Sequence, residues 1–253
     1  MKVLHFCIFK HLKSGINAQL LSEQNAAKKV LPEGCWDIVA FSEDQVESDF
    51  MRQALIFKRF YFKRLANYIS LRLCAYYFLL KNQDRYDYLL IRYFPGDMFL
   101  FFTCILLKTP YITVHHTIEI SEIGVSRGLS SRVSSLFESA FGPCIRKRAV
   151  AIVGVTDEIC NAQLKLISGR NPAFVYPNGI EYRDCITDDR RRDKKEILFM
   201  AGFFYPWHGL DRLIDAAKVS NEAFTVHLIG RVSTDDREAI EADRRAVKAR
   251  RRT

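Results

Sequence analysis

Two adjacent histidines, His115 and His116, stand at the end of a stretch whose pattern predicts a strand, Tyr111–His115. In an open parallel sheet, ligands bind beyond the carboxyl ends of the strands. A histidine there can donate a hydrogen bond to a ligand hydroxyl or stabilise charge near neutral pH. Side chains alternate along a strand, so the two imidazoles should point to opposite sides. A zinc site is disfavoured because no third ligand stands at the usual spacing, and a histidine that only satisfies a buried turn is the alternative.

A second candidate segment follows the first predicted strand. Residues 11–17 read HLKSGIN and lead into a predicted helix, Asn17–Val30. Gly15 lets backbone N–H groups approach a phosphate or sugar oxygen at the beginning of that helix. The dinucleotide fingerprint G-x-G-x-x-G is absent, because Gly15 is the one glycine of the segment, and this argues against an NAD-dependent dehydrogenase. A plain turn between strand and helix is the alternative.

A basic and aromatic stretch, residues 50–83, lies within one long predicted helix, Asp49–Asn82. The stretch contains seven basic residues, nine aromatic residues and no acid. Such a helix can lie in the interface of an anionic membrane, where each basic residue adds about 1 kcal/mol of attraction. Two alternatives stay open. The aromatic side chains can pack in the core while the cations face solvent, or the helix can hold a nucleic-acid backbone, for which no reader motif is present.

Composition and charge narrow the class of protein. Apolar residues make up 49% of the 253 residues, which is enough for a sizeable core. The seven cysteines form no C-x-x-C pair, which favours buried thiols in a reducing compartment. Six basic residues and no acid stand in residues 244–253, so most of the formal charge of +9 is a tail and nucleic acid is not an expected partner. No signal peptide or bilayer-spanning run is found, so we expect a cytoplasmic protein, at the inner face of the membrane if residues 50–83 bind it.

Apolar runs alternate with helical stretches along most of the chain, which indicates an α/β fold with a parallel sheet. Several runs are apolar throughout, as expected of strands covered on both faces. The predicted strands are Val3–Phe9, Trp36–Phe41, Tyr88–Arg92, Tyr111–His115, Ala151–Gly154, Ala173–Tyr176, Ile197–Ala201 and Thr225–Ile229. The predicted helices, besides the two already given, are Asp97–Leu107, Leu129–Lys147, Asp157–Ile167, Leu210–Val219 and Asp235–Arg250.

A charged segment, Glu181–Lys195, interrupts this pattern and is typical of a solvated connection between domains. It predicts a first α/β domain, residues 1–185, and the beginning of a second, residues 196–253. A doubly wound nucleotide-binding domain needs more strand–helix units than residues 196–253 can supply. We therefore expect a second domain that is truncated, or one that a partner completes.

The motifs of the second half occur in a specific order. They are the strand Ala151–Gly154 with the helix-capping residues Thr156, Asp157 and Glu158, then the turn Pro177-Asn178-Gly179, the charged segment, the strand Ile197–Ala201 and the loop GFFYPWHGL at 202–210. In this order they resemble the hinge and the first strand–helix unit of the nucleotide-sugar-binding half of a GT-B glycosyltransferase. The resemblance is to the retaining enzymes of the family-4 type.

The resemblance implies two Rossmann-like domains, with residues 1–185 on the acceptor side and residues 196–253 opening the nucleotide-sugar side. It implies transfer of a sugar from a nucleotide-diphosphate sugar to a hydroxyl acceptor, a cell-surface polysaccharide or a lipid-linked glycan, with retention of configuration. The nucleotide sugar is a substrate, and no cofactor or metal is implied. The implied site residues are His116 as the catalytic residue that contacts the sugar, Gly15 and Asn17 on the acceptor side, and Asn178, Gly202, Phe203, His208 and Gly209 on the donor side.

The donor loop departs from the family pattern at two positions. Phe203 stands where arginine is usual and His208 where lysine is usual. Donors at this place stabilise the negative charge of the departing diphosphate, and histidine is less reliably charged than lysine at neutral pH. The pair of glutamates that the family carries late in the second domain is missing. Two other functions compete with the transferase. The first is a truncated, inactive fragment that keeps acceptor or membrane binding and turns over no nucleotide sugar. The second is a nucleic-acid-binding protein that loses binding when residues 244–253 are removed.

Overall fold

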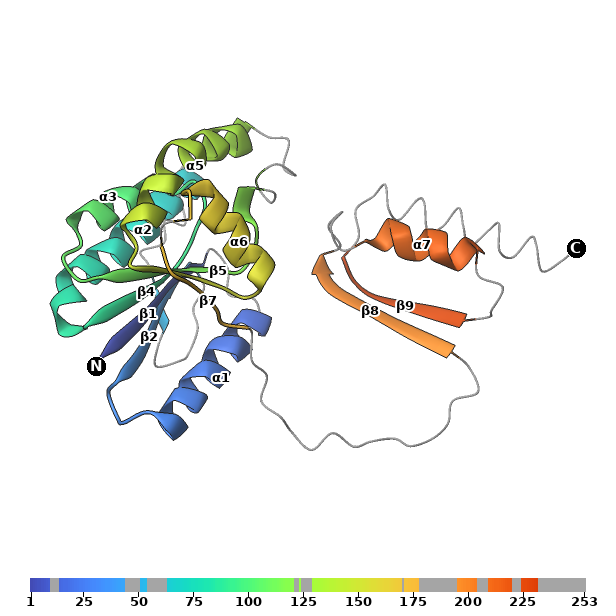
Figure 1. Cartoon of the computed structure of the whole chain (residues 1–253), viewed down its shortest axis with the longest axis horizontal. Coiled ribbons are helices and arrows are strands. Elements are labelled where there is room, and N and C mark those ends of the chain that lie inside the picture. Colours follow the sequence, from blue (N-terminus) through green and yellow to red (C-terminus); the bar gives the residue numbers. More distant parts are fainter. Residues whose placement is uncertain are drawn as a thin grey trace, which may run out of the picture. The chain divides into compact units, whose positions relative to one another are not determined.

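The chain divides into two compact units, Met1–Arg183 and Asp184–Thr253. The computed structural model describes residues 1–9, 14–43, 51–53, 63–120, 123, 129–169, 171–177, 195–203, 209–219 and 224–231. Figure 1 shows the helices and strands of both units. Each unit contains its own sheet of parallel strands, and the fold is therefore α/β in both.

The first unit contains a seven-stranded parallel sheet in the order β3-β2-β1-β4-β5-β6-β7. Its strands are β1 (Val3–Phe9), β2 (Trp36–Ser42), β3 (Met51–Gln53), β4 (Tyr88–Arg92), β5 (Tyr111–His115), β6 (Ala151–Gly154) and β7 (Ala173–Val175). The strand order reverses between β1 and β4, which makes the topology doubly wound. The carboxyl ends of all these strands therefore lie along one edge of the sheet.

The helices of this unit lie on both faces of the sheet. They are α1 (Ser14–Val30), α2 (Lys63–Asn82), the 3-10 helix η1 (Gln83–Arg85), α3 (Met98–Leu106), α5 (Leu129–Arg148) and α6 (Asp157–Leu166). Figure 1 shows α1 on one face and α2, α3, α5 and α6 on the other. Right-handed crossovers require this arrangement, because the chain moves from β1 to β2 in one direction and from β3 to β7 in the opposite direction.

Strand β1 is buried at all seven positions because helices cover both of its faces. Leu4 and Phe6 belong to the large hydrophobic cluster that includes residues of α2, α3 and α5. Cys7 and Phe9 belong to a smaller cluster with Leu20 of α1. Burial stabilises the fold by about 25 cal/mol per Å² of apolar surface. It also fixes the register, because a slip by one residue would exchange the two faces.

The prediction of a single helix over Asp49–Asn82 is wrong. Met51–Gln53 form the edge strand β3, which pairs in parallel with residues 40–42 of β2, and α2 begins only at Lys63. Residues 54–62, which hold much of the basic and aromatic sequence, lie outside the described residues. A strand this short is decided by hydrogen bonds to its neighbour in the sheet, and a local pattern does not encode them.

One cation of α2 is buried, in contrast to the alternative in which the cations of this helix face solvent. Arg72 is 1% exposed, and its Nε donates to Oδ2 of Asp97 at 3.1 Å. The Tyr76 hydroxyl donates to the same oxygen at 2.7 Å. The other Asp97 oxygen accepts from the N–H groups of Phe99 and Leu100 and so caps α3. Arg72 therefore joins α2 to the beginning of α3 instead of facing solvent.

The described part of the second unit is a strand–helix–strand segment. It consists of β8 (Lys195–Phe203), α7 (Leu210–Val219) and β9 (Phe224–Arg231). The two strands are parallel, with an irregular register between Met200 and Phe203. The predicted helix Asp235–Arg250 lies outside the described residues.

The other predicted strands and helices are present, and their ends differ by a few residues at most. The largest such difference is at α1, which begins at Ser14 and not at Asn17. Among the described residues, every helix is too short or too polar to cross a lipid bilayer.

Candidate functional site

His116 follows β5 directly, at the sheet edge where the carboxyl ends of the strands lie. Its side chain is half-buried, and its Nε2 atom is buried without a hydrogen-bond partner among the described residues. Burial, together with the nearby Arg92, His5 and His115, lowers the pKa of His116 to about 3. The imidazole is therefore neutral at neutral pH, so one ring nitrogen can donate and the other can accept a hydrogen bond.

His115 is held in place by groups from several elements. Its Nδ1 lies 2.6 Å from Oε1 of Glu119, and Nε2 of Gln163 donates to the other Glu119 oxygen at 2.6 Å. Its ring stacks on that of Tyr93, with the centroids 4.7 Å apart. Nε2 of His115 also lacks a partner among the described residues, but the side chain is 0% exposed and no ligand can reach it. The bond between His115 and Glu119 closes the turn that carries His116.

Tyr93 connects His115 to a buried ion pair on α5. The Tyr93 hydroxyl donates to Oε2 of Glu138 at 2.8 Å, and Nη2 of Arg146 donates to Oε1 at 2.5 Å. The backbone N–H of Gly96 donates to the same carboxylate at 2.8 Å. The guanidinium carbon of Arg146 lies 4.5 Å from the centroid of the Tyr93 ring. The loop after β4 is thus bound to α5, just as the turn after β5 is bound to α6 through Gln163.

Positively charged groups lie near His116. The guanidinium carbon of Arg92 lies 5.0 Å from the ring centroid of Phe9, the last residue of β1. Nδ1 of His5 lies 2.6 Å from Oε1 of Glu23 on α1, and both side chains are buried. Burial by itself lowers the pKa of His5, but Cys7 and Glu23 raise it to about 10, so His5 is protonated at neutral pH. A neutral imidazole beside cations favours a ligand that carries hydroxyl groups and negative charge.

The two predicted acceptor-side residues belong to α1. Gly15 was expected in the loop before the helix and Asn17 at its first residue, and the structure places both in its first turn. Because α1 follows β1, this turn lies at the same edge of the sheet as His116. The first N–H groups of a helix have no intrahelical acceptor, so the correction leaves the anion-binding argument for this segment intact.

The predicted donor-side residues belong to the second unit or to the connection before it. Gly202 and Phe203 are the last residues of β8. Gly209 directly precedes α7 and has a φ of +71°, a conformation that favours glycine. Asn178 and His208 lie outside the described residues.

The residues that hold the turn after β5 were missed by sequence reasoning. Glu119 comes four residues after His115, Tyr93 directly follows β4, and Glu138, Arg146 and Gln163 come from two helices. One signal was available for Glu138. It is the single acid of an otherwise basic helix, Leu129–Arg148, and an isolated acid among cations is a candidate for a buried ion pair.

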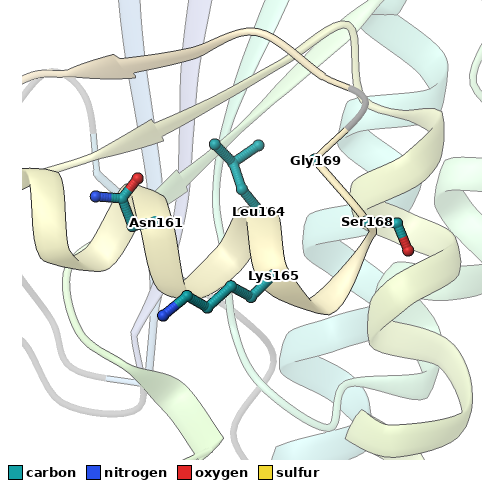
Figure 2. A pocket seen from close by; sticks show the side chains of 5 residues that line it. All are labelled: Asn161, Leu164, Lys165, Ser168 and Gly169. Atoms are coloured by element: carbon teal, nitrogen blue, oxygen red, sulfur yellow. The ribbon is translucent and has the colours of Figure 1, made fainter.

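A surface depression of about 450 Å³ lies elsewhere on the first unit. Figure 2 shows its lining, with Asn161, Leu164 and Lys165 on α6 and Ser168 and Gly169 in the turn that follows. Helix α6 leads from the carboxyl end of β6 to the amino end of β7. Its last turn therefore lies at the edge of the sheet opposite to His116, and the depression is not part of the candidate site.

Metal ligands do not gather anywhere in the described ranges. No group of three or more His, Cys, Asp and Glu side chains in them could hold a metal ion. The cysteines in these ranges are free thiols. The candidate site therefore consists of imidazole, guanidinium, carboxylate and backbone groups.

Comparison with known proteins gives a fold and no sequence family. No protein-family model matches the chain, and no curated protein sequence matches it. Among solved structures, it is similar to a sucrose-phosphate synthase from Thermosynechococcus elongatus, with a TM-score of 0.59, 14% identity, and coverage of 96% of this chain and 67% of the other. It is also similar to the Anabaena HepE protein in complex with UDP and glucose, with a TM-score of 0.56, 15% identity, and coverage of 98% and 66%.

These likenesses establish the architecture. The chain spans about two thirds of the length of both solved structures. At 14 to 15% identity the agreement is one of fold alone. The chain thus has the α/β fold of the GT-B class.

Proposed function

We propose that the chain is a glycosyltransferase that moves a sugar from a nucleotide-diphosphate sugar to a hydroxyl acceptor. One observation carries the proposal: His116 is a neutral imidazole at the carboxyl end of β5, with a buried Nε2 that lacks a partner in the described residues. The fold supports it, since HepE, which shares the architecture, was crystallised with UDP and glucose.

In the proposed reaction the bond between the anomeric carbon and the diphosphate oxygen breaks. A bond from that carbon to the acceptor oxygen forms with retention of configuration, and the acceptor proton passes to the departing diphosphate. His116 contacts the transferred sugar, and cations or N–H groups stabilise the charge that develops on the diphosphate.

Residues 1–185 are proposed as the acceptor-side domain, with Gly15 and Asn17, and residues 196–253 as part of the donor-side domain. The proposed donor-binding residues are Asn178, Gly202, Phe203, His208 and Gly209. The acceptor is proposed to be a polysaccharide or a lipid-linked glycan.

The proposal is tested by titrating the full chain with UDP-glucose, UDP-galactose and UDP-N-acetylglucosamine, with UDP alone as reference. We expect the side-chain nitrogen signals of His116 to shift with a sugar-bearing ligand and not with UDP. His116→Ala should weaken binding of that ligand about two- to tenfold, as expected for one lost hydrogen bond. His227, an exposed histidine on β9, provides the matched control, and His227→Ala should bind as the wild type does. Failure of every UDP-sugar to bind contradicts the proposal.

The inactive-fragment alternative stays a prediction, and release of UDP from the bound sugar nucleotide distinguishes it. Turnover that His116→Ala lowers by about 100-fold or more supports a catalytic role for His116. Binding without turnover favours the alternative, in which this chain keeps ligand or acceptor binding only.

A further inference from the structure

Large apolar side chains are exposed on the outer sides of three neighbouring helices. Helix α3 contacts both α2 and α5, and Figure 1 shows all three on the same face of the sheet. The exposed fractions of these side chains range from 44 to 69%. They are Leu65, Leu73 and Tyr77 on α2, Phe102, Ile105 and Leu106 on α3, and Val133 and Leu136 on α5. We refer to these eight residues as the outer helix surface.

The inner sides of these helices already fill the core, so the outer helix surface is apolar area in excess of what the fold buries. On α2, Leu71, Ala75 and Leu79 are fully buried, whereas Leu73 and Tyr77 point away from the core. Helix α3 reads MFLFFTCIL and is apolar on every side except at Thr103. A helix that is apolar all round is normally covered on all sides, and an exposed apolar patch marks an interaction site.

The charges on these three helices favour an anionic partner. The exposed charged side chains that the structure describes on the three helices are all basic, namely Lys81, Arg132, Lys147 and Arg148. Glu138 is the one acid in the three helices, and it is buried at 2% exposure against Arg146. Lys81 also lies with its Nζ 6.0 Å from the ring centroid of Tyr77. Apolar side chains flanked by cations, with aromatic groups between them, match the interface of an anionic bilayer.

We propose that the outer helix surface docks the first unit onto an anionic lipid bilayer, with the apolar side chains of α3 and α5 in the interface and the cations at the headgroups. A symmetric dimer through the same surface would bring the basic side chains of the two copies together, and this repulsion disfavours it. This contact differs from the one predicted for residues 50–83. Helix α2 contributes only Leu65, Leu73 and Tyr77 to it, and the other residues belong to α3 and α5. The inference does not depend on the proposed sugar transfer.

The test measures binding of the full chain to vesicles by flotation. The wild type should float with vesicles of phosphatidylcholine and phosphatidylglycerol, and much less with phosphatidylcholine alone. Leu106→Ser combined with Leu136→Ser should lower the partition coefficient by about tenfold or more, because apolar area leaves the interface. Lys147→Gln combined with Arg148→Gln should lower binding to the anionic vesicles by about tenfold, with little change on neutral ones.

Val30→Ser is the matched control. Val30 is 80% exposed at the end of α1, on the opposite face of the sheet, and its loss should leave binding unchanged. Thermal unfolding of each variant checks that it is folded, which surface substitutions should preserve. Three results overturn the proposal. The wild type does not float, or the Leu106→Ser/Leu136→Ser variant floats as the wild type does, which would assign binding to another part of the chain. The third is a wild-type dimer that this variant dissociates while vesicle binding persists.

Discussion

His115 and His116 are neighbours in the chain, and their surroundings differ in almost every respect. His115 is 0% exposed, stacks on Tyr93 and is bonded to Glu119, which Gln163 holds in turn. His116 is half-buried, and its Nε2 has no partner in the described part of the chain. The first histidine is thus fixed within the structure at the end of β5, whereas the second is partly exposed and is the one that we propose as a ligand contact.

The difference extends to the groups around the two residues. Around His115, a connected set of buried polar groups includes the Glu138–Arg146 ion pair on α5. Burial of His116, together with the nearby cations Arg92 and His5, keeps its imidazole neutral. Buried charges with partners hold a structure in one conformation, whereas a partly exposed side chain with an unsatisfied polar atom is a candidate for ligand binding. The following predictions test this division.

The largest effect is expected from Glu138→Ala. The substitution leaves the Arg146 guanidinium buried without its counter-ion and removes the acceptor for Tyr93 and Gly96. We expect the free energy of unfolding to fall by about 3–5 kcal/mol, measured by urea denaturation. Ser139→Ala, at the exposed next position, is the control and should change stability by less than about 0.5 kcal/mol. A loss below about 1 kcal/mol for Glu138→Ala would mean that this ion pair does not hold the His115 side together.

A smaller loss is expected from Gly96→Ala in the loop after β4. Gly96 has a φ of +67°, and an added Cβ would lie 2.6 Å from the backbone oxygen of Ser134 on α5. Strain and overlap together should cost about 2–4 kcal/mol. Gly34→Ala is a matched control, because Gly34 has a φ of +75° but an added Cβ there meets no atom within 4 Å. It should lose only about 1–2 kcal/mol from strain. Equal losses for the two variants would show that the approach of α5 to this loop is not close.

The pH dependence of stability should separate His5 from His116. The pKa of His5 is raised to about 10. The contribution of its protonated form to the free energy of unfolding is therefore fully present below the unfolded pKa of about 6.5, and it is lost as the pH rises through 10. The pKa of His116 is lowered to about 3, so between pH 6.5 and 3 the unfolded chain binds a proton that the folded chain does not. The free energy of unfolding should therefore decrease as the pH is lowered from 6.5 to 3. Urea denaturation of His5→Gln and His116→Gln against the wild type should remove the alkaline and the acid dependence respectively, and an unchanged profile would refute the corresponding assignment.

The smallest effect on stability is expected from His116→Ala at neutral pH. The side chain is neutral, partly exposed and without a partner for its Nε2 in the described residues, so the free energy of unfolding should change by about 0.5 kcal/mol or less. His115→Ala is the direct comparison and should cost about 2–4 kcal/mol, because it leaves Glu119 without its buried partner and opens a cavity beside Tyr93. Similar losses at the two positions would abolish the distinction between them.

Much of the fold was predictable from local patterns. Strands β1, β4, β5 and β6 begin and end at the predicted residues, because buried parallel strands are short apolar runs bounded by turns. Helices α5, α6 and α7 were also predicted locally, since their apolar residues repeat with the helical period. The position of His116 at the end of β5 follows directly from the strand assignment.

Other features could not be predicted from one segment at a time. Strand β3 exists because β2 offers hydrogen bonds to it, and Arg72 is buried because Asp97, on a distant part of the chain, lies next to it. His115 contacts Tyr93, which directly follows β4, and the partners of Tyr93 and Glu119 come from α5 and α6, which the sequence gives no reason to bring together in this pairing. Such contacts depend on the order of the strands, which local residue patterns do not encode.

The sequence by itself determined the α/β class, the positions of most strands and helices, and the two histidines at the carboxyl end of a parallel strand. The tertiary structure decided which histidine is partly exposed, which charges are buried as pairs, and which helices expose apolar side chains on the same face of the sheet. The physical reason is that burial and electrostatic environment arise from residues distant in the chain, whereas strand and helix formation depends mainly on residues close to one another.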